Sequence, residues 1–290
     1  MATTQRQLRR ELLTGIRDTE LDVDALIAEL NREIARAARQ NGANKAEFRK
    51  RVIVALVAFW GAYRLLQPTA NKTIAGAVVS YVDASVGRAL VRVGASQTFQ
   101  ALKLSTYADD VAKAVLTRKN VYDGGTIQQR IVTLRRGSEK VVRDMINRGF
   151  AQGLTVNDVA RSIQHYVNPM SQAGRRFTAG NGINYKAVAR GRNLPKGAIR
   201  YNAVRIARSE MMLTYDQAMH QYYEGKPWSK GWRWILSNTH VGEDICDIMA
   251  KGSPYKKPQS RPHPQCTCDQ QPDVMSLSEF EQLVKSGKIK

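Results

Sequence analysis

Three cysteines and two histidines lie close together near the C-terminal end of the chain, and their side chains are those that bind zinc. Cys246, Cys266 and Cys268 are the three cysteines of the 290-residue sequence, and with His240 and His263 they fall within 29 residues. Zinc prefers four tetrahedral ligands drawn from thiolate and imidazole. We predict a metal centre made by Cys246, His263, Cys266 and Cys268. His240 is then an alternative fourth ligand or a residue that contacts a ligand.

The spacing of these residues favours a shared ion. His263 and Cys266 can chelate from one tight turn, which prolines on both sides of His263 stiffen. Cys266 and Cys268 lie on the same side of an extended segment, which brings them to one metal but strains tetrahedral angles. Cys246 is expected in the first turn of a short helix, where the helix dipole favours a thiolate. Two alternatives stay open, namely a disulfide from Cys246 to Cys266 or Cys268, and three buried thiols that pack as small apolar groups.

The same residues give little indication of catalysis. A Cys–His pair can form a nucleophile, but no loop that would stabilise an oxyanion is evident. A zinc deaminase needs His-x-Glu, whereas Glu243 follows His240 at a spacing of three. A metal-dependent nuclease stays an alternative, and its acids would be Glu243, Asp244 and Asp247. These acids also suit the N-terminus of a helix, so we expect a protein that is not an enzyme.

A family resemblance covers about residues 200–272. It rests on Trp234, Leu236, Ser237, His240, Asp244, Ile245, Cys246, Asp247, Ala250, Gly252 and the run Pro262-His263-Pro264-Gln265-Cys266-Thr267-Cys268. These positions resemble the C-terminal signature of phage Mu F-like minor head proteins. Upstream, Arg208-Ser209-Glu210 is similar to an Arg-Thr-Glu triplet of that family. Family members typically carry Arg where this chain has Thr267.

The resemblance implies a structural component of a bacteriophage virion, made in the host cytoplasm and placed at the portal-neck region of the capsid. Minor head, or head morphogenesis, proteins of this kind assist head assembly and DNA packaging or ejection. Their implied partners are the portal and capsid proteins and the phosphate backbone of packaged DNA. Two other functions are weighed beside it: a neck or adaptor ring protein that connects portal to tail, and a DNA-binding protein.

The charge of the chain favours a polyanionic partner. Lys and Arg outnumber Asp and Glu by 45 to 25, which gives a net charge of +20. Each phosphate that such a surface neutralises releases counterions, so association with nucleic acid is favoured. A solvated linker between two domains is the alternative for the most basic segment. The residues expected to contact nucleic acid or a protein partner are Arg175, Arg176, Lys186, Arg190, Arg192, Lys196 and Arg200.

The elements that must position these residues are predicted to be mainly α-helical. We expect a multi-helix region over 1–165, a basic connection containing glycine and proline over 166–197, and a small α+β module with the candidate Cys/His site over 198–290. Apolar periodicity and capping residues predict helices at about 18–41, 45–66, 70–93, 107–119, 126–147 and 155–166.

The C-terminal module is predicted to contain one long helix, one strand and a final short helix. The helix covers about 198–224, and the strand is the aromatic run 232–236. Ser276 and Glu279 form a capping-box pattern that begins the last helix. The most apolar stretch, 52–59, is much shorter than the roughly 20 residues that a membrane span requires. We therefore expect no membrane partner.

Overall fold

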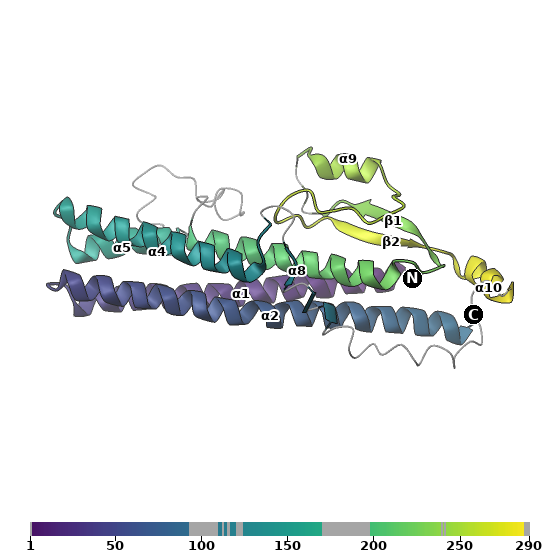
Figure 1. The fold of residues 1–290 in the computed structure, drawn as a ribbon, viewed down its shortest axis with the longest axis horizontal. Helices are drawn as coiled ribbons and strands as arrows, with labels where there is room; N and C mark the ends of the chain where they lie inside the picture. Colours follow the sequence, from purple (N-terminus) through teal and green to yellow (C-terminus); the bar gives the residue numbers. More distant parts are fainter. Residues whose placement is uncertain are drawn as a thin grey trace. The chain divides into compact units, whose positions relative to one another are not determined.

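The structure is a computed structural model, and it describes residues 2–92, 124–169 and 198–286 except 239 and 241, together with part of 110–119. The described part is mainly helical and contains one antiparallel sheet of two strands, which confirms the predicted fold class. Figure 1 labels the helices and strands along the chain. They are α1 (Ala2–Gln40), α2 (Lys45–Arg92), α4 (Ile127–Ala151), α5 (Val156–Val167), α8 (Ile199–Tyr223), β1 (Ser229–Ile235), α9 (Ile245–Lys251), β2 (Asp269–Val274) and α10 (Leu277–Lys285).

The chain divides into two compact units, each built from segments that are separated in the sequence. Unit 1 consists of Met1–Ile16, Pro68–Gly124 and Arg208–Lys290, and unit 2 consists of Arg17–Gln67 and Gly125–Ala207. Helices α1, α2 and α8 therefore each contribute residues to both units. The expected domain boundaries at 165 and 198 stay a prediction, because residues 170–197 lie outside the described residues.

The helices of unit 2 begin where side chains satisfy the first free backbone N–H groups. Thr126 accepts a hydrogen bond from the N–H of Gln129, whose side chain accepts one in return, and this capping box starts α4. Thr155 and Asp158 form the same pair at the start of α5, which begins about where the sequence predicts a helix. Close contact between the two helices follows, since a Cβ atom added at Gly149 would lie 2.6 Å from Cγ2 of Val159.

Helix α2 differs from the sequence-based expectation, because it does not end before Pro68. It runs without a break from Lys45 to Arg92, so the two helices expected at 45–66 and 70–93 are one. Proline removes one backbone hydrogen bond and crowds the preceding turn. That cost is tolerated here because the flanking segments are strongly helical and are anchored by buried side chains, Tyr63 before Pro68 and Ile74 after it. The expectation of a break was therefore wrong.

By length and composition, the segment Lys45–Tyr81 of α2 is long and apolar enough to cross a membrane. A search of the described residues finds this one segment. About a third of its most apolar window, 33%, is buried inside the protein. The core helices of soluble proteins pass the same test. Phe48, Trp60 and Tyr63 in this segment are at most 1% exposed, and the hydroxyl of Tyr63 donates to the carbonyl of Ala203 at 2.7 Å.

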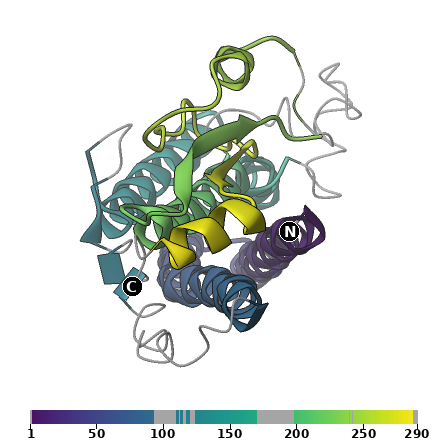
Figure 2. The ribbon, with the colours of Figure 1, turned by 90° about the vertical axis from the view of Figure 1, so that its right-hand side faces the viewer.

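Unit 1 contains the small sheet and its surroundings. Strands β1 and β2 are antiparallel, with Trp234 opposite Gln270 and Ile235 opposite Asp269, and Figure 2 shows them side by side. Helix α9 contacts β1. Strand β2 was not predicted, because its sequence lacks alternating apolar residues and contains Pro272. Proline is accepted there because each strand of a two-stranded sheet is an edge strand.

Candidate metal centre

The five candidate ligands come from three neighbouring segments of unit 1. His240 lies in the turn that follows β1, and Cys246 lies in the first turn of α9, as predicted. His263 and Cys266 lie in the loop of residues 252–268, which we call the ligand loop, and Cys268 ends this loop directly before β2. The three cysteines are at most 2% exposed and share a buried cluster with Trp234.

The distances among these side chains are those that a tetrahedral metal requires. The Cys246 Sγ atom lies 3.5 Å from Sγ of Cys266 and 3.4 Å from Nε2 of His263, and Sγ of Cys268 lies 3.9 Å from Nδ1 of His240. A tetrahedral zinc ion with ordinary bond lengths separates two sulfur ligands by about 3.8 Å and a sulfur from a nitrogen ligand by about 3.6 Å. The cluster could therefore hold a metal ion.

Cys246 is the residue that joins the two halves of the cluster. It forms one group with His263 and Cys266 and a second group with His240 and Cys268, and within each group all ligand atoms lie within 4.8 Å of one another. Three thiolates together with either imidazole make a complete tetrahedral set. The structure therefore brings the five predicted residues into two overlapping groups of three, which share Cys246.

Polar contacts hold each imidazole with one nitrogen beside a thiol. Nε2 of His240 lies 2.9 Å from the carboxylate of Asp247, so this nitrogen carries the proton and Nδ1 is left to face Cys268. Nδ1 of His263 lies 3.1 Å from the carbonyl of Pro264, and its Nε2 lies 3.4 Å from Sγ of Cys246 and 3.3 Å from the carboxylate of Asp244. Such partners commonly fix the tautomer of a metal-binding histidine.

The electrostatics of the thiols favour a bound cation. In a cluster that holds only protons, burial raises the pKa of Cys246 to about 12. The pKa of Cys268 is lowered to about 5, mainly by the neighbouring thiol of Cys266. The backbone N–H of Ser237 also donates to Sγ of Cys268, at 3.5 Å. Burial therefore opposes ionisation of Cys246, and a divalent cation that replaced its proton would offset this cost.

The acids that a nuclease would use serve the start of α9. Asp244 caps this helix and accepts a hydrogen bond from the N–H of Cys246, while Asp247 accepts one from the N–H of Asp244. His240, Asp244 and Asp247 do lie within 4.8 Å of one another, although Glu243 is exposed and takes no part in this group. Backbone N–H groups at the start of α9, together with His240, account for the placement of both carboxylates.

The three cysteines are free thiols, so the disulfide alternative is not realised in this structure. The Sγ atoms of Cys246 and Cys266 are 3.5 Å apart, well beyond the about 2.05 Å of a disulfide bond. The packing of the thiols against Trp234 also fits the alternative of small apolar groups. This last alternative leaves unexplained why one imidazole nitrogen lies beside Cys246 and another beside Cys268.

Most of the basic residues expected to contact a partner fall outside the described residues. These are Arg175, Arg176, Lys186, Arg190, Arg192 and Lys196. Arg200, which is described, lies in α8 within unit 2. Its guanidinium donates to both carboxylate oxygens of Asp24, at 2.5 and 2.8 Å. This side chain is therefore engaged in an ion pair inside the protein.

Sequence reasoning missed three buried polar residues that hold the ligand loop. Arg261 and Asp216 form an ion pair, and the hydroxyl of Ser209 accepts a hydrogen bond from the N–H of Gln265 at 3.0 Å. The triplet that contains Ser209 was noticed for its resemblance alone. Ser209 and Asp216 are seven residues apart on α8, and nothing in the neighbouring sequence indicates that they contact a distant loop.

The fold and the cluster define the class of this chain: a mainly helical protein with a small α+β module built around Cys and His side chains that could hold a metal ion. Comparisons with protein-family models, with curated proteins and with solved structures find no match.

Proposed function

We propose that the chain is a structural component of a bacteriophage head, similar to Mu F-like minor head proteins, and that a zinc ion ties its C-terminal module. The observation that carries the proposal is that residues of the resemblance between Trp234 and Cys268 meet in one cluster. Trp234, Cys246, Cys266 and Cys268 share the buried cluster, and His240 and His263 adjoin it. These residues of the signature thus form one local structure.

A structural role for the metal is supported by the burial of the cluster. The thiols are closed off from solvent, and three thiolates with one imidazole complete a tetrahedral shell without an open position for water or substrate. Zinc is the metal best suited to three thiolates and an imidazole, since it has no redox chemistry and accepts this tetrahedral set. The sheet has two strands, so its apolar core is small. A zinc ion bound by side chains around the sheet would add stability that this core lacks.

Placement in the virion is tested with phage particles. Particles assembled with the wild-type chain are expected to contain it in few copies beside the portal, whereas a neck or adaptor ring protein would be present in a multiple of the portal symmetry. Quantitative mass spectrometry of purified particles gives this copy number. Particles that lack the chain and are fully infectious would contradict the proposal.

Contact with packaged DNA is the part of the proposed function that rests on charge. The net charge of +20 supports binding to the phosphate backbone without sequence preference. Titrating the purified chain with duplex DNA at several salt concentrations should show a steep fall of the binding constant with salt. Metal-dependent cleavage of that DNA in the same samples would favour the nuclease alternative.

A further inference from the structure

Arg261 is a buried cation that contacts the backbone on both sides of Thr267. Its side chain is 2% exposed, and its Nη1 atom donates to the carbonyls of Cys266 at 3.1 Å and of Cys268 at 2.7 Å. These are the carbonyls of two candidate metal ligands that are separated by one residue. A single nitrogen that holds both carbonyls restricts the backbone between them, and therefore the distance between the two thiols.

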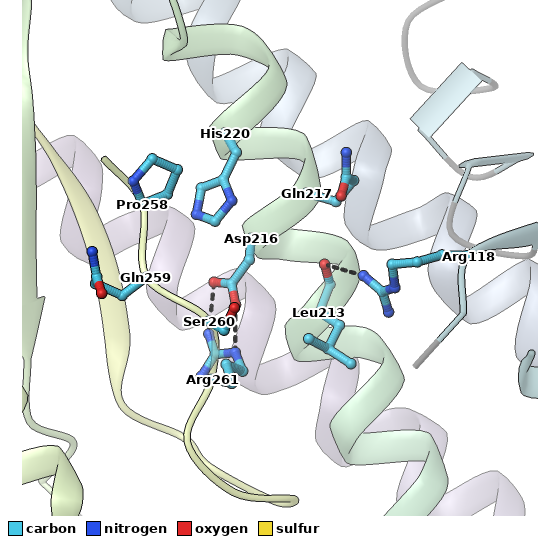
Figure 3. A pocket seen from close by; sticks show the side chains of 9 residues that line it. All are labelled: Arg118, Leu213, Asp216, Gln217, His220, Pro258, Gln259, Ser260 and Arg261. Atoms are coloured by element: carbon cyan, nitrogen blue, oxygen red, sulfur yellow. Dashed lines mark hydrogen bonds and ion pairs between the residues drawn. The ribbon is translucent and has the colours of Figure 1, made fainter. Parts of the chain in front are cut away.

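The other side of the same guanidinium binds helix α8. Nη2 of Arg261 donates to Oδ1 of Asp216 at 2.8 Å, and Nε lies 2.6 Å from Oδ2 of the same carboxylate. Figure 3 shows Arg261 reaching from the ligand loop to Asp216, which projects from α8. Asp216 is 7% exposed, so both charges of this pair are buried. A planar guanidinium can form such a two-sided contact, whereas the point charge of lysine cannot.

A second contact attaches the same loop to α8 about two helical turns away. The N–H of Gln265 donates to Oγ of Ser209 at 3.0 Å, and Gln265 has a φ of 62°, in the left-handed region. This residue directly precedes Cys266. The segment that presents Cys266 and Cys268 is thus held at its start by Ser209 and along its length by Arg261.

We infer that Arg261 and Asp216 are positioning residues of the metal centre, and that they couple metal binding by the ligand loop to the packing of that loop on α8. The inference rests on the metal centre of the proposed function. Because such coupling is reciprocal, an ion that orders Cys266 and Cys268 also strengthens the contact with α8, and loss of that contact weakens binding of the ion.

The test compares metal binding by the full-length wild-type chain and by Asp216→Asn, with Asp273→Asn as the matched control. Asp273 also pairs with an arginine in unit 1, at 3.2 Å from Arg233, but that arginine is 58% exposed and the pair lies across the small sheet. The probes are Co²⁺, whose visible absorption reports tetrahedral thiolate coordination, and Zn²⁺ in competition with it. We expect Asp216→Asn to bind either ion about 10–100-fold more weakly, and Asp273→Asn to bind as the wild type does.

Hydrogen exchange distinguishes coupling from simple stabilisation. If the Arg261–Asp216 pair only stabilised the fold, zinc binding would not change amide exchange in α8 through this pair. Zinc should slow amide exchange over residues 209–216 of α8 in the wild-type chain and have much less effect on this segment in Asp216→Asn. If both variants bind Co²⁺ with wild-type affinity and spectrum, and zinc protects α8 equally in all three chains, the coupling does not exist.

Arg261→Lys decides the matter if Asp216→Asn fails to fold. Lysine keeps the positive charge but lacks the planar set of N–H donors of a guanidinium. We therefore expect a folded Arg261→Lys chain to show altered Co²⁺ absorption and to bind the ion more weakly. A folded Arg261→Lys chain with wild-type absorption and affinity would overturn it. Failure of the wild-type chain itself to bind Co²⁺ or Zn²⁺ would instead contradict the proposed metal centre. The two failures are therefore distinguishable.

Discussion

The carboxylate of Asp247 lies 2.9 Å from Nε2 of His240, on the side of the imidazole opposite the Cys268 thiol. Asp247 is itself held by the backbone N–H of Asp244, and this hydrogen bond is the main reason why the pKa of Asp247 is lowered. The hydrogen bond with Asp247 in turn raises the pKa of His240. A carboxylate placed in this way orients an imidazole whose other nitrogen is available to a metal.

The two histidines are expected to be partly interchangeable as ligands. Each faces a thiol through one nitrogen, so His240→Ala and His263→Ala should each keep one tetrahedral Co²⁺ ion and bind it about tenfold more weakly. The double variant should lose the tetrahedral absorption. Titration with Co²⁺ followed by visible spectroscopy makes the comparison. A single variant that already loses all tetrahedral binding would show that one histidine is the sole imidazole ligand.

Replacing Cys266 with serine should unfold the C-terminal module and spare unit 2. The serine hydroxyl in a Cys266→Ser chain would bind zinc poorly, and a small module tied by its metal loses much of its folding free energy with the ion. Limited proteolysis, with the fragments identified by mass spectrometry, distinguishes the two units. A protected fragment that spans residues 208–286 in the variant would be inconsistent with a structural metal.

The contact between α4 and α5 gives a prediction about unit 2 alone. Alanine at position 149 would bring its Cβ atom to 2.6 Å from the buried Val159, so Gly149→Ala should destabilise the protein by about 1–3 kcal/mol. Gly137 lies on the same helix, and a Cβ atom there meets nothing within 4 Å. Gly137→Ala should therefore stabilise by about 1 kcal/mol. Chemical denaturation of both variants checks the opposite signs, and equal effects would place α5 elsewhere.

The start of α10 should weaken in acid. Lys230 donates to both oxygens of Glu279, and the N–H and hydroxyl of Ser276 donate to the same carboxylate, so the pKa of Glu279 falls from 4.5 to about 2. A pKa that is lower in the folded state means that the stabilisation is present above about pH 4.5 and is lost as the pH falls toward 2. An NMR titration of Glu279 measures this midpoint.

The Glu279→Gln variant is the control for this titration. Its amide cannot ionise, so α10 should lose this part of its pH dependence while the rest of the protein keeps its own. A midpoint near 4.5 in the wild-type chain would show that the contacts of Glu279 with Lys230 and Ser276 are not formed in solution.

Features set by neighbouring residues were predicted from the sequence, and features set by distant contacts were not. The capping pairs at Thr155 and Ser276 are local, and they begin α5 and α10 as expected. The position of Cys246 at the start of α9 follows from the same kind of signal. Strand β2 depends on its partner β1, because a segment with the sequence Asp-Gln-Gln-Pro has no strand pattern of its own.

The candidate site was predicted to the extent that residue chemistry determines it. Cysteine and histidine are recognisable as ligands wherever they lie, so the five side chains were identified before their distances were known. The buried pair of Arg261 and Asp216 was not, because 45 residues separate the two and charged residues are usually exposed. Their role depends on a burial that only the folded chain shows.

The most direct test is the metal content of the native protein together with its thiol reactivity. Elemental analysis of chain purified without chelator should give one zinc ion per chain, and a thiol reagent should react with the three cysteines only after the ion is removed. Metal-free protein whose C-terminal module is folded and whose thiols react at once, or protein that cannot take up zinc or cobalt, would contradict the account.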